Sequence, residues 1–214
     1  LRGRDIKRYS YEWADLWLIA TFPSMHYDIE QYPAIKEHLL SFGMERLEQT
    51  GKEYVVDGQH IKARKKTNNK WFETQDSISY VDFLSQHKIV WKRVGSILRF
   101  SYDENQFLTL DSTCFAVGKN IEYICCVLNS SMGHYLLKDA PQTGTGDLLI
   151  SVQAIEPLRL PIISEEDDSL FIGWLNQLIL SQDGTSLEQV VLNKIFDLYG
   201  LTPVEREFIK TNFS

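Results

Sequence analysis

The sequence lacks the features of a membrane or secreted protein. No apolar run reaches the roughly 20 residues that a membrane-spanning helix needs, and no apolar signal-peptide core follows the basic opening. The 214 residues include only three cysteines, and neither C-x-x-C nor a paired Cys/His spacing indicates a zinc site. We therefore expect a cytoplasmic protein without membrane contact, in which Cys125 and Cys126 are buried, reduced thiols.

Motifs for catalysis are also missing. A Mg²⁺-dependent nuclease needs an acid followed later by Asp/Glu-x-Lys, but the only such triplet, Asp5-Ile6-Lys7, has no acid before it. An amino-methyltransferase needs an Asn/Asp-Pro-Pro-aromatic loop, and each of the six prolines stands alone. No Gly-x-Ser-x-Gly elbow indicates a hydrolase, and no histidine pairs at i, i+4. We expect no catalytic residue, metal or cofactor site in these residues.

The glycine-rich segment 140–147 is an incomplete phosphate loop. Its Thr143-Gly-Thr-Gly146 follows a predicted helix rather than a strand, and no Lys comes after the glycines. The pattern therefore favours a connector, and the alternative is a contact of the threonine hydroxyls with a DNA backbone.

The residues that are present predict an α+β fold. Hydrophobic residues make up 43% of the chain, enough for a folded core. Apolar patterning predicts strands at 13–22, 88–91, 96–102, 107–117 and 148–155, and helices at 32–48 and 121–137. Residues 53–69 read as a loop or exposed hairpin, and Gly43 is placed to interrupt the first helix. The sheet is expected to be mixed or antiparallel.

The end of the chain predicts two or three helices with recognisable caps. Asp168 or Ser169 is a candidate cap for a helix that reaches Leu180. Ser186 and Gln189 have capping-box spacing for a second helix that ends at Gly200. Thr202-Pro203-x-Glu205 has the cap, first-turn proline and reciprocal acid of a third helix.

The charge is distributed unevenly along the chain. The net charge is −7, yet residues 164–214 hold nine acids and three bases, so residues 1–163 are nearly neutral. Within residues 1–163 the bases cluster, and a local basic patch attracts phosphate whatever the total charge. We predict DNA contacts by ten residues: Arg2, Arg4, Arg8, Lys62, Arg64, Lys65, Lys66, Lys70, Lys92 and Arg93.

The basic stretch 58–70 has the side chains that DNA recognition uses. Lys and Arg neutralise phosphates, while Arg, Asn and Gln make paired hydrogen bonds to base edges in the major groove. Gln59, His60, Asn68 and Asn69 lie between these charges, and Trp71 follows as an anchor for the loop. Without other information, a solvated loop explains the same composition. Joint replacement of Arg64, Lys65 and Lys66 by Ala is expected to weaken DNA binding and its salt dependence.

Several short segments, in order, resemble the C-terminal specificity domain of type IIG restriction–modification enzymes. These enzymes join a nuclease, an adenine methyltransferase and a target recognition domain. The segments are listed by their residues: 1–9, 32–42, 70–73, 88–91, 128–131, 160–162 and, as the most specific, Phe196-Asp-Leu-Tyr-Gly-Leu-Thr-Pro203.

The resemblance implies a role and a division of the chain. It implies a bacterial, non-catalytic domain that reads double-stranded DNA, with a recognition body at 1–163, like that of type I specificity subunits, and a helical segment at 164–214. It also implies that SAM, Mg²⁺ and the active sites belong to methyltransferase and nuclease domains elsewhere in the same protein. Since this chain starts at Leu1 rather than Met, we expect it to be part of that longer protein, with the acidic segment facing away from DNA.

Two other functions remain open from the sequence. One is a protein-interaction module of a phage-defence methyltransferase, which would bind DNA only with partners and would dock through the acidic helices. The other is an enzyme with an unfamiliar site around Asp103, Asp111 and His134, which would need a pocket with converging carboxylates.

Overall fold

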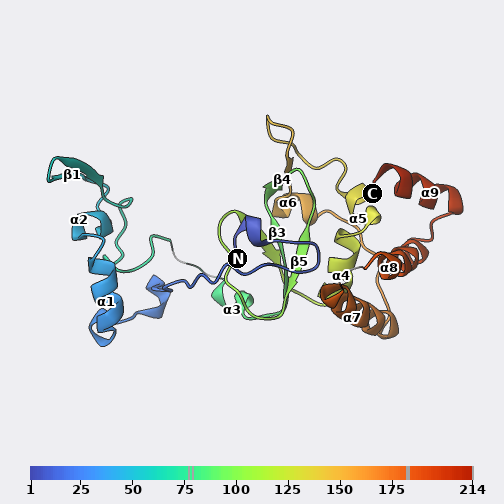
Figure 1. Cartoon of the computed structure of the whole chain (residues 1–214), viewed down its shortest axis with the longest axis horizontal. Coiled ribbons are helices and arrows are strands. Elements are labelled where there is room, and N and C mark those ends of the chain that lie inside the picture. Colours follow the sequence, from blue (N-terminus) through green and yellow to red (C-terminus); the bar gives the residue numbers. More distant parts are fainter. Residues whose placement is uncertain (77, 79, 182–183, 214) are drawn as a thin grey trace. The chain divides into compact units, whose positions relative to one another are not determined.

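The computed structural model describes residues 1–76, 78, 80–181 and 184–213. The chain forms two compact units, which are described separately (Figure 1). Unit 1 contains residues 1–15 and 82–214, and unit 2 contains residues 16–81. The fold class is α+β, as predicted, and every paired strand is antiparallel in the described part.

Unit 2 is a small body of two short helices and a hairpin. Its elements are α1 (Pro33–Leu40), α2 (Met44–Leu47), β1 (Glu53–Val56) and β2 (Gln59–Lys62). Gly43, at φ +87°, separates the two helices, because only glycine adopts this conformation readily. The predicted hairpin in residues 53–69 is confirmed.

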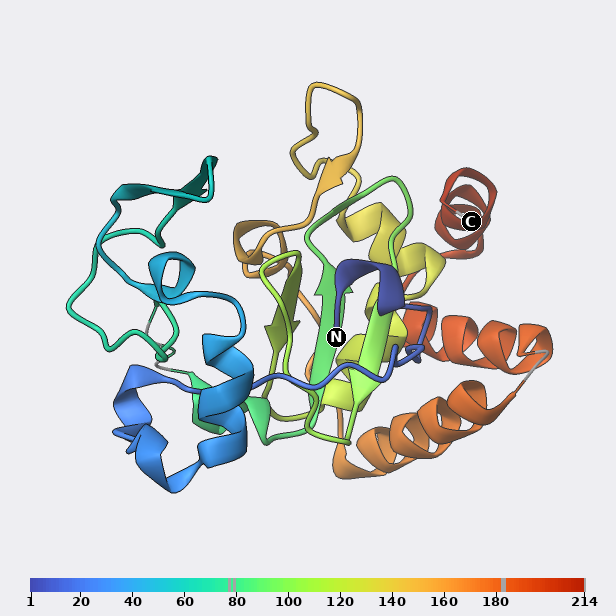
Figure 2. The ribbon, with the colours of Figure 1, turned by 60° about the vertical axis from the view of Figure 1, so that its left-hand side comes forward.

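Unit 1 is built on a three-stranded sheet with β3 in the centre, in the order β5-β3-β6. The strands and short elements of this unit are β3 (Lys88–Lys92), β4 (Val94–Gly95), β5 (Phe100–Asp103), β6 (Thr113–Ala116), β7 (Leu148–Leu149) and α6 (Val152–Ile155), with α3 (Val81–Leu84) at the boundary with unit 2. Strand β3 is buried along Lys88–Trp91, and α4 (Ile121–Leu128) packs against β3 and β5. Figure 2 shows this helix on one face of the sheet.

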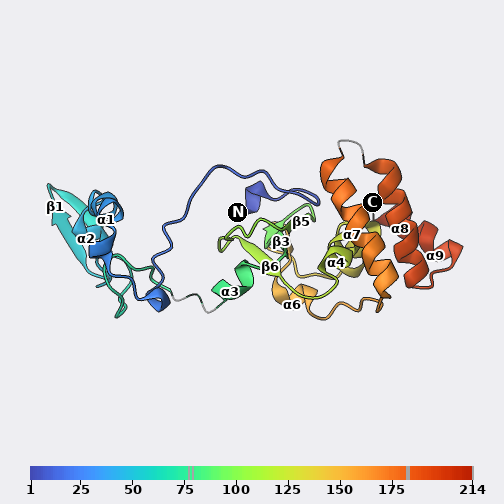
Figure 3. The same cartoon turned by 90° about the horizontal axis from the view of Figure 1, so that it is seen from below.

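The remaining helices of unit 1 continue the same core. They are α5 (Ser131–Leu136), α7 (Glu165–Leu180), α8 (Thr185–Leu198) and α9 (Pro203–Asn212). Helix α4 contacts α7 and α8, while α5 contacts α8 and α9. Figure 3 shows α7 and α8 side by side next to α4. Phe171, Leu175, Ile195 and Phe196 are fully buried in this contact, so residues after 163 share the core of unit 1.

The predicted caps are confirmed at one helix and wrong at two. Thr202 and Glu205 form the capping box of α9. Helix α7 begins earlier than predicted, with Ser164 as its cap instead of Asp168 or Ser169. Helix α8 has Gly184 at its cap position and no side-chain cap, so the box predicted at Ser186 is wrong.

The segment 13–22 does not form the buried strands predicted for it. It contains no strand, and Trp17 is 85% exposed. Asp15 has φ +54°, which ends an extended backbone, and the apolar residues do not alternate as a half-buried strand requires. The prediction of strands in this segment was wrong because it relied on apolar content alone.

Three predicted strands are shorter in the structure, and one predicted helix is divided in two. The strands predicted at 96–102 and 107–117 are reduced to β5 and β6, and the strand predicted at 148–155 stops at Leu149, before the helical turn α6.

The helix predicted at 121–137 is interrupted at Asn129. Its side-chain amide donates to the Phe100 and Cys125 carbonyls and its Oδ1 accepts from the Phe100 amide. Asn129 thus joins the end of α4 to β5, and Ser130 caps α5.

A buried ion pair joins the first residue of β3 to the last residue of β5. Lys88 and Asp103 are register partners, their side chains are 0% exposed, and Lys88 Nζ lies 2.7 Å from Asp103 Oδ2. The same ammonium donates to the Leu84 carbonyl, and Asp103 accepts from the Tyr11 hydroxyl and the Phe107 amide. All these partners compensate for the loss of hydration.

Replacing Lys88 with Met should lower the free energy of unfolding by about 3–5 kcal/mol, because a buried Asp103 would lose its partner. Denaturant unfolding followed by circular dichroism measures this change. The double variant Lys88→Met/Asp103→Asn removes both charges and should recover part of the loss. A single variant as stable as the original chain would contradict the role of this ion pair.

Candidate nucleic-acid interface

The hairpin of unit 2 presents one exposed face. Asp57 and Gly58 connect its strands at φ +50° and +77°, the conformation of the tight turn that matches strand twist. Register pairs Glu53 with Lys62 and Val55 with His60, so these four side chains share a face. All four are exposed, whereas Tyr54 and Ile61 on the opposite face are half-buried. A two-stranded ribbon of this kind fits a DNA major groove.

Arg64 holds the segment after the hairpin in place. Its guanidinium donates to the main-chain carbonyls of Leu47 at 2.6 Å and Glu73 at 2.9 Å, and also to that of Trp71. Burial lowers the pKa of this side chain from its ordinary value. The predicted DNA contact of Arg64 stays a prediction, but the structure gives this residue a structural role.

Of the other predicted cations of unit 2, some contact protein groups and others are exposed without an ion pair. Lys65 pairs with Asp76, and Lys70 Nζ lies 5.5 Å from the centre of the Phe72 ring. Lys62 and Lys66 are exposed and form no ion pair within the described residues. Lys52, which the sequence analysis did not select, is also exposed. It follows Gly51, where a Cβ atom would lie 3.4 Å from the Lys66 main-chain nitrogen.

The neutral side chains of the basic stretch fall into two groups, those that bond within the loop and those that are exposed. The Asn69 amide donates to the Thr74 and Gln75 carbonyls, so it stabilises the loop. Gln59, His60 and Asn68 are exposed. Trp71 is half-buried with its ring at 84° to Phe72, as expected of an anchor.

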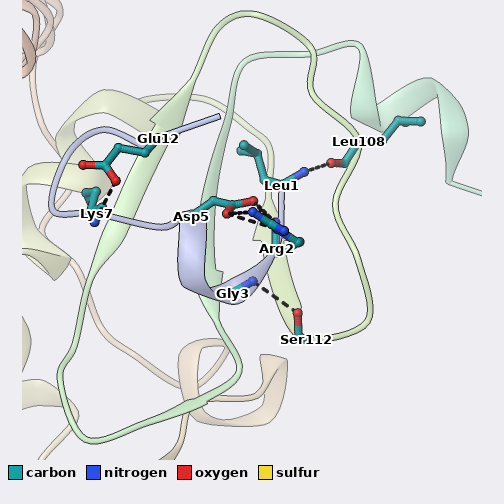
Figure 4. A network of polar contacts seen from close by, with 8 residues as sticks. All are labelled: Leu1, Arg2, Gly3, Asp5, Lys7, Glu12, Leu108 and Ser112. Atoms are coloured by element: carbon teal, nitrogen blue, oxygen red, sulfur yellow. Dashed lines mark hydrogen bonds and ion pairs between the residues drawn. The ribbon is translucent and has the colours of Figure 1, made fainter. Parts of the chain in front are cut away.

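Two of the predicted cations in unit 1 are engaged by protein groups. Arg2 forms an ion pair with Asp5 at 2.7 Å (Figure 4). Arg8 donates to the Asn129 carbonyl at 2.8 Å and pairs with Glu188 of α8 at 2.9 Å. Their DNA contacts stay predictions, although each would have to share its charge with an acid.

Arg4 and Lys92 lie together in one cleft of unit 1. This cleft has a volume of about 190 Å³, and Arg99 also lines it. All three side chains are exposed and form no ion pair among the described residues. Arg93, the neighbour of Lys92, is exposed outside this lining. No sequence pattern indicated Arg99, because it is the only charged residue in the apolar run Ile97–Phe100.

The three residues suggested for an enzymatic site have different local environments. Asp103 forms the buried ion pair with Lys88, and Asp111 is exposed. His134 Nδ1 lies 3.2 Å from the Phe213 carbonyl oxygen. Burial lowers the pKa of His134. None of the three lines the cleft of unit 1 or the apolar pocket of unit 2 around Tyr27 and Tyr32.

Metal and thiol chemistry receive no support from the described part of the chain. No group of three or more His, Cys, Asp or Glu is placed there to hold a metal ion. Cys125 and Cys126 are fully buried, as predicted, and burial raises the pKa of both thiols. No helix among the described residues is long and apolar enough to cross a membrane.

The acidic residues after Ser164 have a local structural explanation. Glu165, Glu166, Asp167 and Asp168 form the first turn of α7, where negative charge is favoured by the helix dipole. Asp167 also pairs with Lys194 of α8. Asp167 therefore joins α7 to α8, and the direction of the acidic residues relative to DNA stays a prediction.

Comparison with known proteins adds one finding. Residues 1–162 match the family model of the TaqI-like C-terminal specificity domain. The matched range includes the hairpin of unit 2 and the cleft of unit 1, and it ends before α7. No curated protein matches the chain.

Replacing Arg64 with Ala should destabilise unit 2 by about 2–4 kcal/mol, because three carbonyls would lose a charged donor. Hydrogen exchange of the unit 2 amides measures this loss. Lys66→Ala is the matched control, since its side chain is exposed and its removal should change stability by less than about 0.5 kcal/mol. Equal protection in both variants would show that Arg64 does not hold the loop.

Proposed function

The chain belongs to the family of TaqI-like C-terminal specificity domains, and on this basis we propose that it recognises a specific base sequence in double-stranded DNA. The single observation that carries this proposal is the family match over residues 1–162. The exposed ribbon face of β1–β2 supports it, because a ribbon can enter the major groove. Exposed lysines beside the hairpin supply the phosphate contacts that such docking needs.

The proposal extends to the protein that contains this chain. The chain serves as the specificity domain of a type IIG enzyme in the bacterial cytoplasm and performs no chemistry itself. Methyl transfer from SAM to adenine and Mg²⁺-dependent cleavage belong to methyltransferase and nuclease domains of the same protein. Residues 1–163 recognise DNA, and residues 164–214 face away from it.

Within the ribbon, different residues have different roles. The outer face of the hairpin, with Glu53, Val55, His60 and Lys62, contacts base edges. Glu accepts a hydrogen bond from cytosine, an apolar side chain contacts the thymine methyl group, and Lys binds guanine. Lys52 and Lys66 bind phosphates, which position the ribbon without reading sequence.

A pool of randomised duplexes tests the function directly. The unaltered chain should retain DNA at low salt and enrich a short motif, because base contacts add to the phosphate contacts. Sequencing of the retained duplexes identifies the motif. Salt-sensitive retention without any motif would contradict sequence recognition by this chain. Absence of retention even at low salt would favour the protein-interaction module.

Replacing Lys62 with Ala should alter the enriched motif at one position, because a base contact contributes about 1–3 kcal/mol of discrimination. Replacing Lys66 with Ala should weaken binding to all sequences and leave the motif unchanged. The same selection measures both variants, with the exposed Lys119→Ala as a control. An unchanged motif for Lys62→Ala would contradict base reading by that residue.

A further inference from the structure

The cleft in unit 1 is formed by the opening of the chain and by the segment 92–99 between β3 and β5. Arg4 comes from the opening of the chain, Lys92 from the end of β3, and Arg99 from the residues before β5. Its volume of about 190 Å³ equals roughly six water molecules at about 30 Å³ each. The cleft is therefore large enough for a phosphate group but small for a base pair.

Two glycines place the Lys92 side chain in this cleft. A Cβ atom on Gly3 would lie 3.0 Å from Lys92 Cγ, and one on Gly95 would lie 3.4 Å from Lys92 Cδ and 3.6 Å from Nζ. Larger residues at these positions would displace the lysine stem. The amide of Gly3 donates to Ser112 Oγ at 3.2 Å, which holds this part of the opening segment (Figure 4).

The surrounding acid is already neutralised. Asp5 follows Arg4 in the sequence, but both of its oxygens accept hydrogen bonds from Arg2 (Figure 4). The hydrogen bonds and the positive charge of Arg2 lower the pKa of the Asp5 carboxyl, and they outweigh burial, which acts in the opposite direction. The cleft lining contains three cations and no carboxylate, and a cleft lined by one sign of charge concentrates its field on a counter-ion.

We propose that this cleft binds a backbone phosphate of the DNA that the chain recognises, through Arg4, Lys92 and Arg99. The inference rests on the proposed function and adds a binding site to it. Arginine binds phosphate oxygens through paired hydrogen bonds, and lysine adds a point charge. Ser96 offers a hydroxyl, and Ile97, 62% exposed, offers an apolar surface for the adjoining sugar. The site holds the strand in place and reads no base.

The test compares the unaltered chain with Arg4→Gln/Arg99→Gln, using the duplex that the randomised pool enriches. The control is Lys119→Gln/Arg159→Gln, which removes two exposed cations of unit 1 outside the cleft. Loss of two phosphate contacts should lower the slope of log affinity against log salt by about 2 and weaken binding roughly 50-fold near 0.1 M salt. The control should change neither quantity, and the enriched motif should stay the same in both variants.

A second variant tests the cleft without removing its cations. Ser96→Asp places a carboxylate in the lining and should weaken DNA binding at low salt, because the new charge competes with phosphate. Thermal unfolding confirms that each variant remains folded. An unchanged salt slope in Arg4→Gln/Arg99→Gln, an equal loss in the control, or an altered motif would each overturn the proposed site. If the unaltered chain retains no duplex, that result overturns both the proposed function and this inference.

Discussion

The arrangement of unit 1 depends on the buried ion pair between Lys88 and Asp103. An isolated charge at either position would be very unfavourable, so the pair requires β3 and β5 to keep their register. The oxygens of Asp103 also accept from Tyr11 and from the turn that follows β5. One carboxylate therefore connects the sheet, the opening segment and the loop, and the cationic cleft lies at the opposite end of β3.

Buried polar contacts also stabilise unit 2, which has fewer apolar residues. A body of 66 residues, 16–81, has little volume for a hydrophobic core, and polar side chains supply part of its cohesion. Arg64, Gln49 and Asn69 donate to main-chain carbonyls between Leu47 and Gln75. These contacts hold the basic segment against the helices. They leave the outer face of the hairpin exposed, where a binding role requires it.

The two units show that residue type alone does not predict a binding role. Arg64 and Arg2 satisfy protein acceptors, while Arg4 and Arg99 remain exposed in a cleft. The cluster of cations at residues 62–70 stays a predicted DNA contact, but the structure separates its members: Lys66 is exposed, whereas Arg64 donates to main-chain carbonyls. Arg99 could not be found from sequence, because only the fold brings it to the same cleft as Arg4, which is 95 positions away in the chain.

The sequence by itself determined the features that depend on neighbouring residues. The exposed hairpin and the capping box at Thr202 follow from local spacing, since their hydrogen bonds join residues close in the chain. The α+β class and the buried strand at Lys88–Trp91 follow from the apolar pattern, although the partners of this strand lie further along the chain, at 100–103 and 113–116. Tertiary structure alone decided that Trp13–Phe22 is not a buried strand, that Asn129 divides the long helix, and which cations remain available. These outcomes depend on contacts between residues far apart in the chain, for which local patterns contain no signal.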